Sequence, residues 1–309
     1  MKCVILLGFI AFMHQSVCAQ RILFKERSAN GATTERFGKY VDGVVQFSYC
    51  PLNVVQYSTH NSFTSMSQWT SSPSGAIYWT NGFAIYKYDF ELGRNQLVID
   101  KLFRVTQLVA TDKHIYIVSH PDQSLDALSS RYAKGQKLLR INTTTGKREQ
   151  ISVPDWVNFA NLSISADENT ISFIHTINHD DESLQEQQFC LYNLVSKKVS
   201  IIDQGQFTNN EHFGISQMQN SSVWLDSNRL LYYKCEGGKA SGTIFYYDIN
   251  NKTHIAWLKS IDDKNITGFS YSNRWFYFFD GQKVYKTKDG INREVMVEWG
   301  AQEAFLVKQ

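Results

Sequence analysis

A pattern of short apolar and aromatic segments recurs five times along the chain and restricts what it can fold into. The central segments of the five units are residues 77–80, 115–118, 171–174, 230–233 and 275–278. A small-polar segment precedes each one, and a second apolar segment, a polar turn and a fourth segment follow it. Alternation with a period of two residues is typical of β-strands, and no segment after the first twenty residues keeps a helical period of 3.6. The chain is therefore predicted to be all-β.

The spacing of these units favours one all-β architecture. Successive central segments start 38, 56, 59 and 45 residues apart. Four antiparallel strands that recur every ~40–60 residues are the sequence pattern of a β-propeller. A β-sandwich is the alternative, but it does not explain why the strand types recur in the same order. We predict a β-propeller of four-stranded antiparallel blades, with six blades expected and five as the alternative.

Strand-like segments near both ends of the chain are expected to form the remaining blade. Residues 21–37 resemble a hairpin, residues 41–57 add two short strand candidates, and residues 304–309 are also strand-like. Joining strands from the two termini would close the ring and leave only short sheet edges. Residues 20–309 are therefore expected to be a single propeller domain.

The first nineteen residues have the composition of a secretory signal peptide. Lys2 gives a positive start, residues 4–13 are apolar, and Val17 and Ala19 suit a cleavage site before Gln20. No later segment approaches ~18 uninterrupted apolar residues, so no membrane insertion is expected. The chain has 31 Lys and Arg residues against 29 Asp and Glu residues, and this balance argues against broad binding to nucleic acid. We expect a secreted, extracellular protein.

The glycosylation sequons and the cysteine count are consistent with an extracellular protein. Five Asn-x-Ser/Thr sequons are candidate glycosylation sites: Asn142, Asn161, Asn220, Asn251 and Asn265. The chain without its signal peptide keeps three cysteines, Cys50, Cys190 and Cys235. A disulfide between Cys190 and Cys235 is the first candidate, and Cys50 with either one is the alternative.

One unit resembles a known family. Residues 75–89 contain Tyr78-Trp79-Thr80-Asn81 and are similar to a YWTD repeat of the low-density lipoprotein receptor class, with Asn81 in place of the usual Asp. The other units keep only the general strand pattern. The resemblance implies a six-bladed propeller with an extracellular binding or scaffold role.

The loops between the second and third strands of the units are expected to form a binding face. They are long in the three middle units, at residues 120–136, 177–187 and 235–242, and strand alternation places all three at the same end of the ring. The connections at residues 154–159 and 205–214 reach that end as well. The candidate binding residues on this face are Trp156, Phe159, Phe207, His212, Phe213, Asp180 and Asp181. The aromatic ones are either anchors for a partner or residues that pack the loops down.

We therefore expect a glycosylated propeller that binds an extracellular protein or a glycan through its long-loop face, and not an enzyme. The alternative is a secreted hydrolase or lactonase with a divalent cation in the central channel. Asp180 and Asp181 could contribute oxygen ligands to Ca²⁺, but they lack the spacing of an EF-hand, and a solvated charge run is the preferred interpretation. No cofactor and no dedicated metal site are predicted, since no thiolate or helical His motif is present.

Overall fold

The computed structural model describes most of the chain as β-structure. The described residues are 21–26, 34–41, 44–52, 68–102, 104–121, 135–177, 186–206, 212–213, 222–235, 242–259, 266, 268–272, 274–280, 283–298 and 303–308. Every regular element in these ranges is a strand, which confirms the all-β prediction. Within the same ranges, no helix has the length and apolar character needed to cross a membrane.

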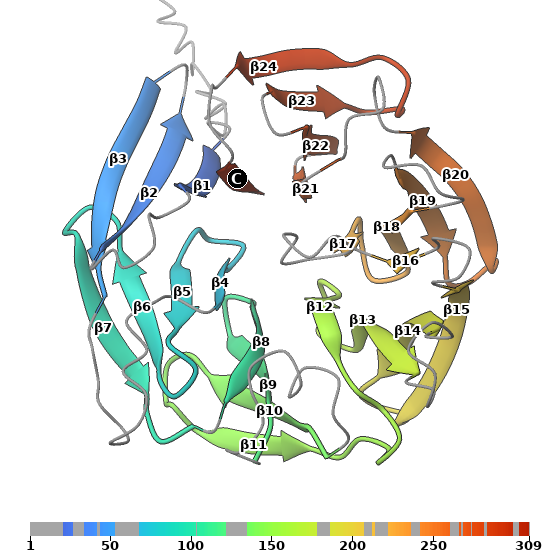
Figure 1. Cartoon of the computed structure of the whole chain (residues 1–309), viewed down its shortest axis with the longest axis horizontal. Helices are drawn as coiled ribbons and strands as arrows, with labels where there is room; N and C mark the ends of the chain where they lie inside the picture. The colour runs from blue at the N-terminus through green and yellow to red at the C-terminus, as the bar shows by residue number, and fades with distance from the viewer. Residues whose placement is uncertain are drawn as a thin grey trace, which may run out of the picture.

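The described strands form six sheets, and we number them as blades along the chain (Figure 1). Blade 1 contains β25 (Glu303–Lys308), β1 (Arg21–Glu26), β2 (Thr34–Val41) and β3 (Val44–Pro51). Blade 2 contains β4 (Gln68–Ser71), β5 (Ile77–Thr80), β6 (Ile85–Asp89) and β7 (Arg94–Ile99). Blade 3 contains β8 (Val105–Ala110), β9 (His114–Ser119), β10 (Lys137–Asn142) and β11 (Arg148–Ile151).

The second half of the chain forms the other three blades. Blade 4 contains β12 (Ala160–Ile164), β13 (Thr170–Ile177), β14 (Glu186–Asn193) and β15 (Lys198–Gln206). Blade 5 contains β16 (His212–Phe213) and β17 (Ser222–Trp224), which both pair with β18 (Arg229–Cys235), followed by β19 (Gly242–Asp248) and β20 (Thr253–Lys259). Blade 6 contains β21 (Gly268–Ser272), β22 (Trp275–Phe279), β23 (Lys283–Thr287) and β24 (Glu294–Glu298).

The blades surround a central axis as a propeller (Figure 1). All the strand pairs within them are antiparallel, and the inner strands β4, β8, β12, β17 and β21 contact one another in sequence around the axis. The inner strand of blade 1 is β25, which pairs with β1 from Arg21↔Lys308 to Glu26↔Glu303 and also contacts β21. Blade 1 is thus built from both ends of the chain, which holds the ring together and leaves no open sheet between its first and last blades.

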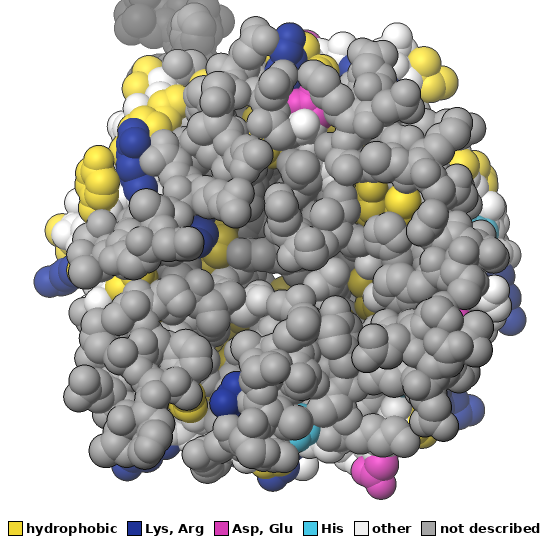
Figure 2. All heavy atoms as spheres, in the orientation of Figure 1, with side chains coloured by type: hydrophobic (Ala, Val, Ile, Leu, Met, Phe, Trp, Pro, Cys, Tyr) yellow, Lys and Arg dark blue, Asp and Glu magenta, His cyan; other side chains and the backbone are white. Residues whose placement is uncertain are grey.

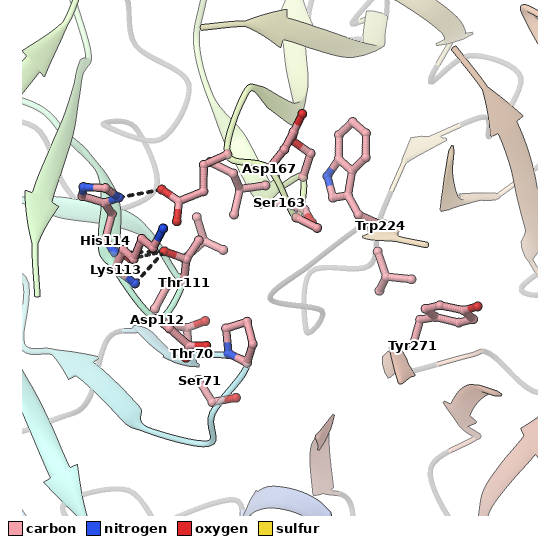
Figure 3. A pocket seen from close by; sticks show the side chains of 18 of the residues that line it. Thr70, Ser71, Thr111, Asp112, Lys113, His114, Ser163, Asp167, Trp224 and Tyr271 are labelled. Atoms are coloured by element: carbon pink, nitrogen blue, oxygen red, sulfur yellow. Dashed lines mark hydrogen bonds and ion pairs between the residues drawn. The ribbon is translucent and has the colours of Figure 1, made fainter. Parts of the chain in front are cut away.

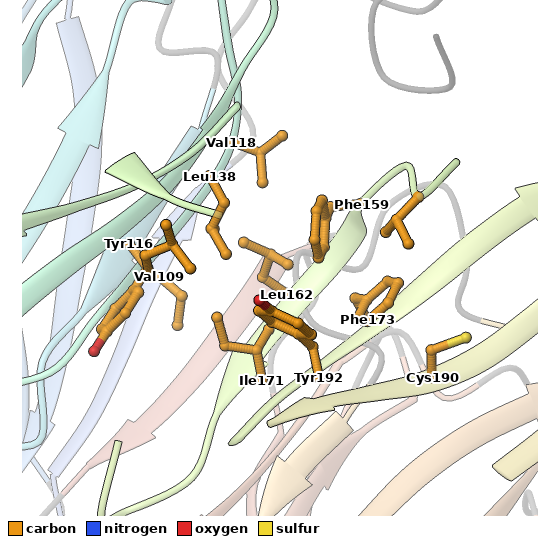
Figure 4. Close-up of a cluster of buried hydrophobic side chains, with 12 residues drawn as sticks. Val109, Tyr116, Val118, Leu138, Phe159, Leu162, Ile171, Phe173, Cys190 and Tyr192 are labelled. Atoms are coloured by element: carbon orange, nitrogen blue, oxygen red, sulfur yellow. The ribbon is translucent and has the colours of Figure 1, made fainter. Parts of the chain in front are cut away.

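The hydrophobic core lies between neighbouring blades, because each central strand buries both of its faces. In β9, Tyr116 and Val118 pack against blade 4, while Ile115 and Ile117 pack against residues of blade 2. Figure 4 shows the cluster between blades 3 and 4, to which Tyr116 of β9 and Tyr192 of β14 both belong. A side chain of this size contributes about 1.5–3 kcal/mol when it is fully buried. Alternate residues of each central strand therefore belong to two different cores, one on each side of the blade.

The YWTD-like unit has a defined hydrogen-bonding role in its turn. Asn81 is buried, and its Oδ1 accepts hydrogen bonds from the backbone N–H groups of Phe83, at 3.0 Å, and Ala84, at 2.9 Å. Thr80 Oγ1 accepts from the N–H of Gly82 at 2.9 Å, and Gly82 has a φ of 94°. An Asn supplies the same oxygen acceptor as an Asp in such a turn.

The predicted disulfide between Cys190 and Cys235 is wrong in this structure. Cys190 packs in the core between blades 3 and 4, whereas Cys235 packs in the core between blades 5 and 6. The two side chains point away from each other, and Cys50 belongs to a third cluster, so none of the three forms a disulfide with another. Burial raises the pKa of the Cys190 thiol to about 12, so this residue behaves as a small apolar side chain.

Candidate functional site

The candidate aromatic residues of the long-loop face differ in exposure. Trp156 is 47% exposed, and its ring packs edge-on against His175 with 5.2 Å between centroids. Phe159 and Phe213 are buried, which agrees with the alternative that these aromatic residues pack the loops down. Phe159 packs on Phe173 at 4.6 Å in the core between blades 3 and 4. Phe213 packs in the core between blades 4 and 5, so both residues hold their connections against the ring.

The rest of the predicted binding face lies outside the described residues. Phe207, Asp180 and Asp181 are not described, and of His212 only the backbone is, where it pairs with Cys235. Most of the surface facing the viewer in Figure 2 belongs to undescribed residues. Binding through the long-loop face therefore stays a prediction.

Three of the five sequons lie in described residues; Asn220 and Asn265 do not. Asn142 is the last residue of β10, and its Oδ1 accepts hydrogen bonds from the backbone N–H groups of Thr144 and Thr145 in the following turn. Asn251 is exposed in the turn between β19 and β20. Asn161 differs from both, because it lies in the inner strand β12 with a φ of 52° and donates its backbone N–H to Gln107 Oε1 of blade 3.

A cavity of about 760 Å³ lies at the centre of the ring (Figure 3). The inner strands of five blades line it, through β4, β8, β12, β17 and β21. Turns between first and second strands also line it, including Asp112 and Lys113 after β8 and Asp167 and Glu168 after β12. Because successive strands alternate in direction, these turns lie at the opposite end of the ring from the long loops. The cavity is thus a site that our loop-based reasoning did not find.

Hydroxyl groups are the commonest polar groups on the cavity wall. The inner strands contribute Thr70, Ser71, Ser163, Ser222, Ser270 and Ser272. The small-polar first segments of the repeat were the sequence signal for this wall, since a strand buried on both faces would otherwise be apolar.

Two polar atoms of the wall have unmet hydrogen-bonding capacity. Among the described residues, Ser71 Oγ and Trp224 Nε1 are buried and have no hydrogen-bond partner. Buried polar groups in folded proteins are nearly always paired with protein, water or ligand. Neither atom has surface accessible from the cavity, so a molecule in the cavity would reach neither one without a rearrangement of the wall.

A charged network forms the wall at blades 3 and 4. Glu168 Oε2 lies 2.6 Å from His114 Nδ1 and accepts a hydrogen bond from Tyr116 OH at 2.9 Å. Burial alone would raise the pKa of Glu168, but hydrogen bonds from Thr111, His114 and Tyr116 outweigh burial and hold the pKa below its usual value. Glu168 is therefore a fixed negative charge at neutral pH.

A second carboxylate on this wall, that of Asp167, is also kept in its charged form by hydrogen bonds. Burial would raise the pKa of Asp167, but hydrogen bonds from Ser165 and Asn169 lower it overall. Trp224 and Tyr271, on the next two inner strands along the chain, also line the cavity, and Trp224 lies beside Asp167 and Ser163 (Figure 3). The wall thus combines carboxylates, hydroxyls and aromatic rings. Among the described residues, no group of three or more His, Cys, Asp and Glu side chains is arranged to hold a metal ion.

Comparison with known proteins identifies the fold only. No protein-family model matches the chain, and no curated protein matches its sequence significantly.

The solved structures of three proteins are similar to it. TolB from Acinetobacter baumannii has a TM-score of 0.57 at 13% identity, over 93% of this chain and 66% of TolB. Nidogen in a nidogen/laminin complex has a TM-score of 0.56 at 9% identity, over 94% of this chain and 98% of the other. An oligogalacturonate lyase in complex with manganese has a TM-score of 0.54 at 14% identity, over 89% of this chain and 78% of the lyase. The chain is thus similar in fold to binding proteins and to an enzyme alike, and the fold it shares with them is the β-propeller.

Proposed function

We propose that the protein is a secreted binding protein that takes its ligand in the central cavity, at the end of the ring opposite the long loops. The observation that carries this proposal is the cavity of about 760 Å³, whose wall combines hydroxyls, three carboxylates and the partly exposed rings of Trp224 and Tyr271. Ligand sites are typically concave, occupy about 300–1,000 Å³, and combine apolar surface with a few placed polar groups.

Secretion and glycosylation are part of this proposal. The signal-like pattern of residues 1–19 supports secretion, and glycosylation is supported by Asn251, which is exposed in the turn between β19 and β20, and by Asn142, which is partly exposed at the end of β10. The YWTD-like unit and the likeness to nidogen support an extracellular binding role. We infer that the chain is a divergent relative of the YWTD-type propellers, and that its partner is an extracellular protein or a glycan.

Binding arrays with matched variants test the proposal. The full chain, secreted from cultured cells, would be applied to one array of glycans and one of extracellular-matrix proteins. The variants are Trp224→Ala, which removes the aromatic wall of the cavity, and Trp156→Ala, which removes an exposed ring from the long-loop end. Both are checked for folding by thermal unfolding.

We expect binding that Trp224→Ala removes and Trp156→Ala retains. The opposite result would place the ligand on the long-loop face and contradict the proposal. If the protein binds to neither array, the proposed binding function is contradicted.

A further inference from the structure

The outer strand of blade 1 lacks the charges that the other five outer strands carry. The strands β7, β11, β15, β20 and β24 each contain at least one Lys, Arg, Asp or Glu residue. The outer strand of blade 1, β3, contains none. Charged side chains, Lys above all, are a common means of preventing the exposed edge of a sheet from pairing with another chain. Five of the six blades thus have this protection, and blade 1 does not.

The same strand has the most apolar surface of the outer strands. Among the described side chains, three large hydrophobic residues of β3 are exposed: Val44 at 59%, Phe47 at 42% and Tyr49 at 60%. The other outer strands expose at most one described residue of this kind each, such as Leu97 of β7 at 51%. Figure 2 shows hydrophobic side chains beside basic ones at the position that β3 has in Figure 1. Blade 1 therefore combines an uncharged edge with exposed aromatic rings.

Contacts from blade 2 hold one end of β3 in place. Ser48 Oγ donates a hydrogen bond to the Phe90 carbonyl at 2.7 Å, and Asn95 Nδ2 donates one to the Pro51 carbonyl. In the described part of the chain, β3 pairs with one strand, β2, and it is the outermost strand of its blade (Figure 1). The edge is therefore preorganised to accept a further strand by backbone pairing.

Antiparallel pairing of β3 with β3 of a second copy matches the exposed rings. A two-fold axis perpendicular to the sheet keeps equal faces of the two strands together, so residues of the same alternation oppose each other. With Phe47 on this axis, its ring faces Phe47 of the second copy, and Val45 faces Tyr49 of the second copy. Aromatic and β-branched pairs of this kind stabilise antiparallel sheets. The strand is therefore complementary to itself.

Charge does not oppose this pairing. β3 brings no charged side chain to the axis, and on the same face the Arg36 guanidinium of β2 stacks on the Phe47 ring at 3.6 Å. Three strand spacings and an offset of four residues would separate the two Arg36 side chains of the dimer by about 20 Å. This separation exceeds the Debye length of about 8 Å at physiological ionic strength. On the other face, Lys39 is already paired with Glu91 at 2.5 Å.

We propose that blade 1 is a dimerisation surface, at which β3 strands of two copies of this chain pair antiparallel about a two-fold axis at Phe47. The two four-stranded sheets then form one continuous sheet that joins the two rings. Because β3 lies at the outer rim and the cavity lies at the centre, this inference is independent of the proposed binding function.

Sedimentation equilibrium of the full secreted chain, at about 1–200 µM, tests the proposal. The variants Phe47→Lys and Tyr49→Lys place a charge on β3. The matched control is Leu97→Lys, which places the same charge at a similarly exposed residue of another outer strand. Tyr49→Lys keeps the test informative if Phe47→Lys fails to fold because it loses the contact with Arg36.

A pair of cysteine variants tests the register. Residues directly opposite in antiparallel strands have Cα atoms about 4.5–5.5 Å apart, which is within the range of a disulfide. Phe47→Cys should therefore form a disulfide-linked dimer when the protein is oxidised with diamide. Leu97→Cys, treated in the same way, is the control.

We expect the unmodified chain to be dimeric at the upper end of the concentration range. Phe47→Lys and Tyr49→Lys should each raise the Kd of the dimer at least about tenfold, because every dimer gains two cations and loses two ring contacts. Leu97→Lys should leave this Kd unchanged, and Leu97→Cys should form no disulfide-linked dimer.

Four results would overturn the proposal. A chain that is monomeric over the whole range has no such surface. Dimers that neither β3 variant weakens, or that Leu97→Lys weakens equally, would not be formed by blade 1. Dimers in which Phe47→Cys forms no disulfide would not have the antiparallel register.

Discussion

A buried ion pair joins blades 4 and 5 next to the strand that carries Trp224, and removing its carboxylate should strongly destabilise the ring. Asp203 of β15 accepts a hydrogen bond from Lys234 Nζ of β18 at 2.9 Å and one from Tyr232 OH at 2.7 Å. The side chains of Asp203 and Lys234 are each only 11% exposed. The change to make is Asp203→Ala, which deletes both acceptors and leaves a buried ammonium.

The expected loss of stability in Asp203→Ala depends on the contacts that Lys234 retains. Removing one partner of a buried pair typically costs about 3–5 kcal/mol, because the other charge remains buried without compensation. Lys234 Nζ would keep its hydrogen bond to the Gln204 carbonyl, at 2.8 Å, and its place 5.4 Å from the Phe213 ring. These two contacts reduce the loss, so we expect about 3 kcal/mol for Asp203→Ala.

The reciprocal change should cost less. Lys234→Met leaves Asp203 with the Tyr232 hydroxyl and with His254 Nε2, which is 3.7 Å away. We therefore expect about 1–2 kcal/mol for Lys234→Met. The double variant removes both charges together, so it should be more stable than Asp203→Ala alone.

Urea denaturation followed by tryptophan fluorescence measures these differences. Midpoints should shift while the slope with denaturant stays constant, since the exposed surface does not change. The reasoning is refuted if Asp203→Ala costs less than about 1 kcal/mol, the range of a solvent-exposed pair. It is also refuted if the two single changes add in the double variant, because independent sites add and coupled ones do not.

Four further predictions concern single features of the structure. Gly242→Ala places a Cβ in steric overlap with the ring of the buried Tyr233, so we expect low secretion yield and a lowered melting temperature. The pKa of Glu168 is lower in the folded protein than in the unfolded chain. Ionised Glu168 therefore stabilises the fold above the unfolded pKa of about 4.3, and this contribution is lost as the pH falls through the folded pKa. Glu168→Gln should therefore reduce the loss of stability that acidification causes. Mass spectrometry of the secreted protein after glycosidase treatment should find Asn142 and Asn251 modified. Excess calcium should not raise the melting temperature over a chelator control, and a saturable rise would instead support a cation site.

The repeat pattern was sufficient to predict the architecture, and the reason is physical. The central strand of each blade packs against both neighbouring blades, so it appears in the sequence as a short continuous apolar run that recurs once per blade, as at residues 115–118. The exposure of loop aromatics was harder to predict, because a ring in a connection can either project or cover a core. Phe159 and Phe213 cover cores, while Trp156 projects. Local sequence does not distinguish these two outcomes.

The cavity could not be assembled from sequence alone, because its residues come from five segments spread between positions 70 and 272. The serine and threonine residues of the first strands were visible, but only the ring brings them together.

The most direct test of the account is an experimental structure of the secreted chain with a saturating concentration of a ligand that the binding arrays identify. The account predicts that this ligand lies in the central cavity, in contact with Trp224 and Tyr271. A ligand bound at the long-loop end, or a cavity that stays empty at saturation, would contradict it.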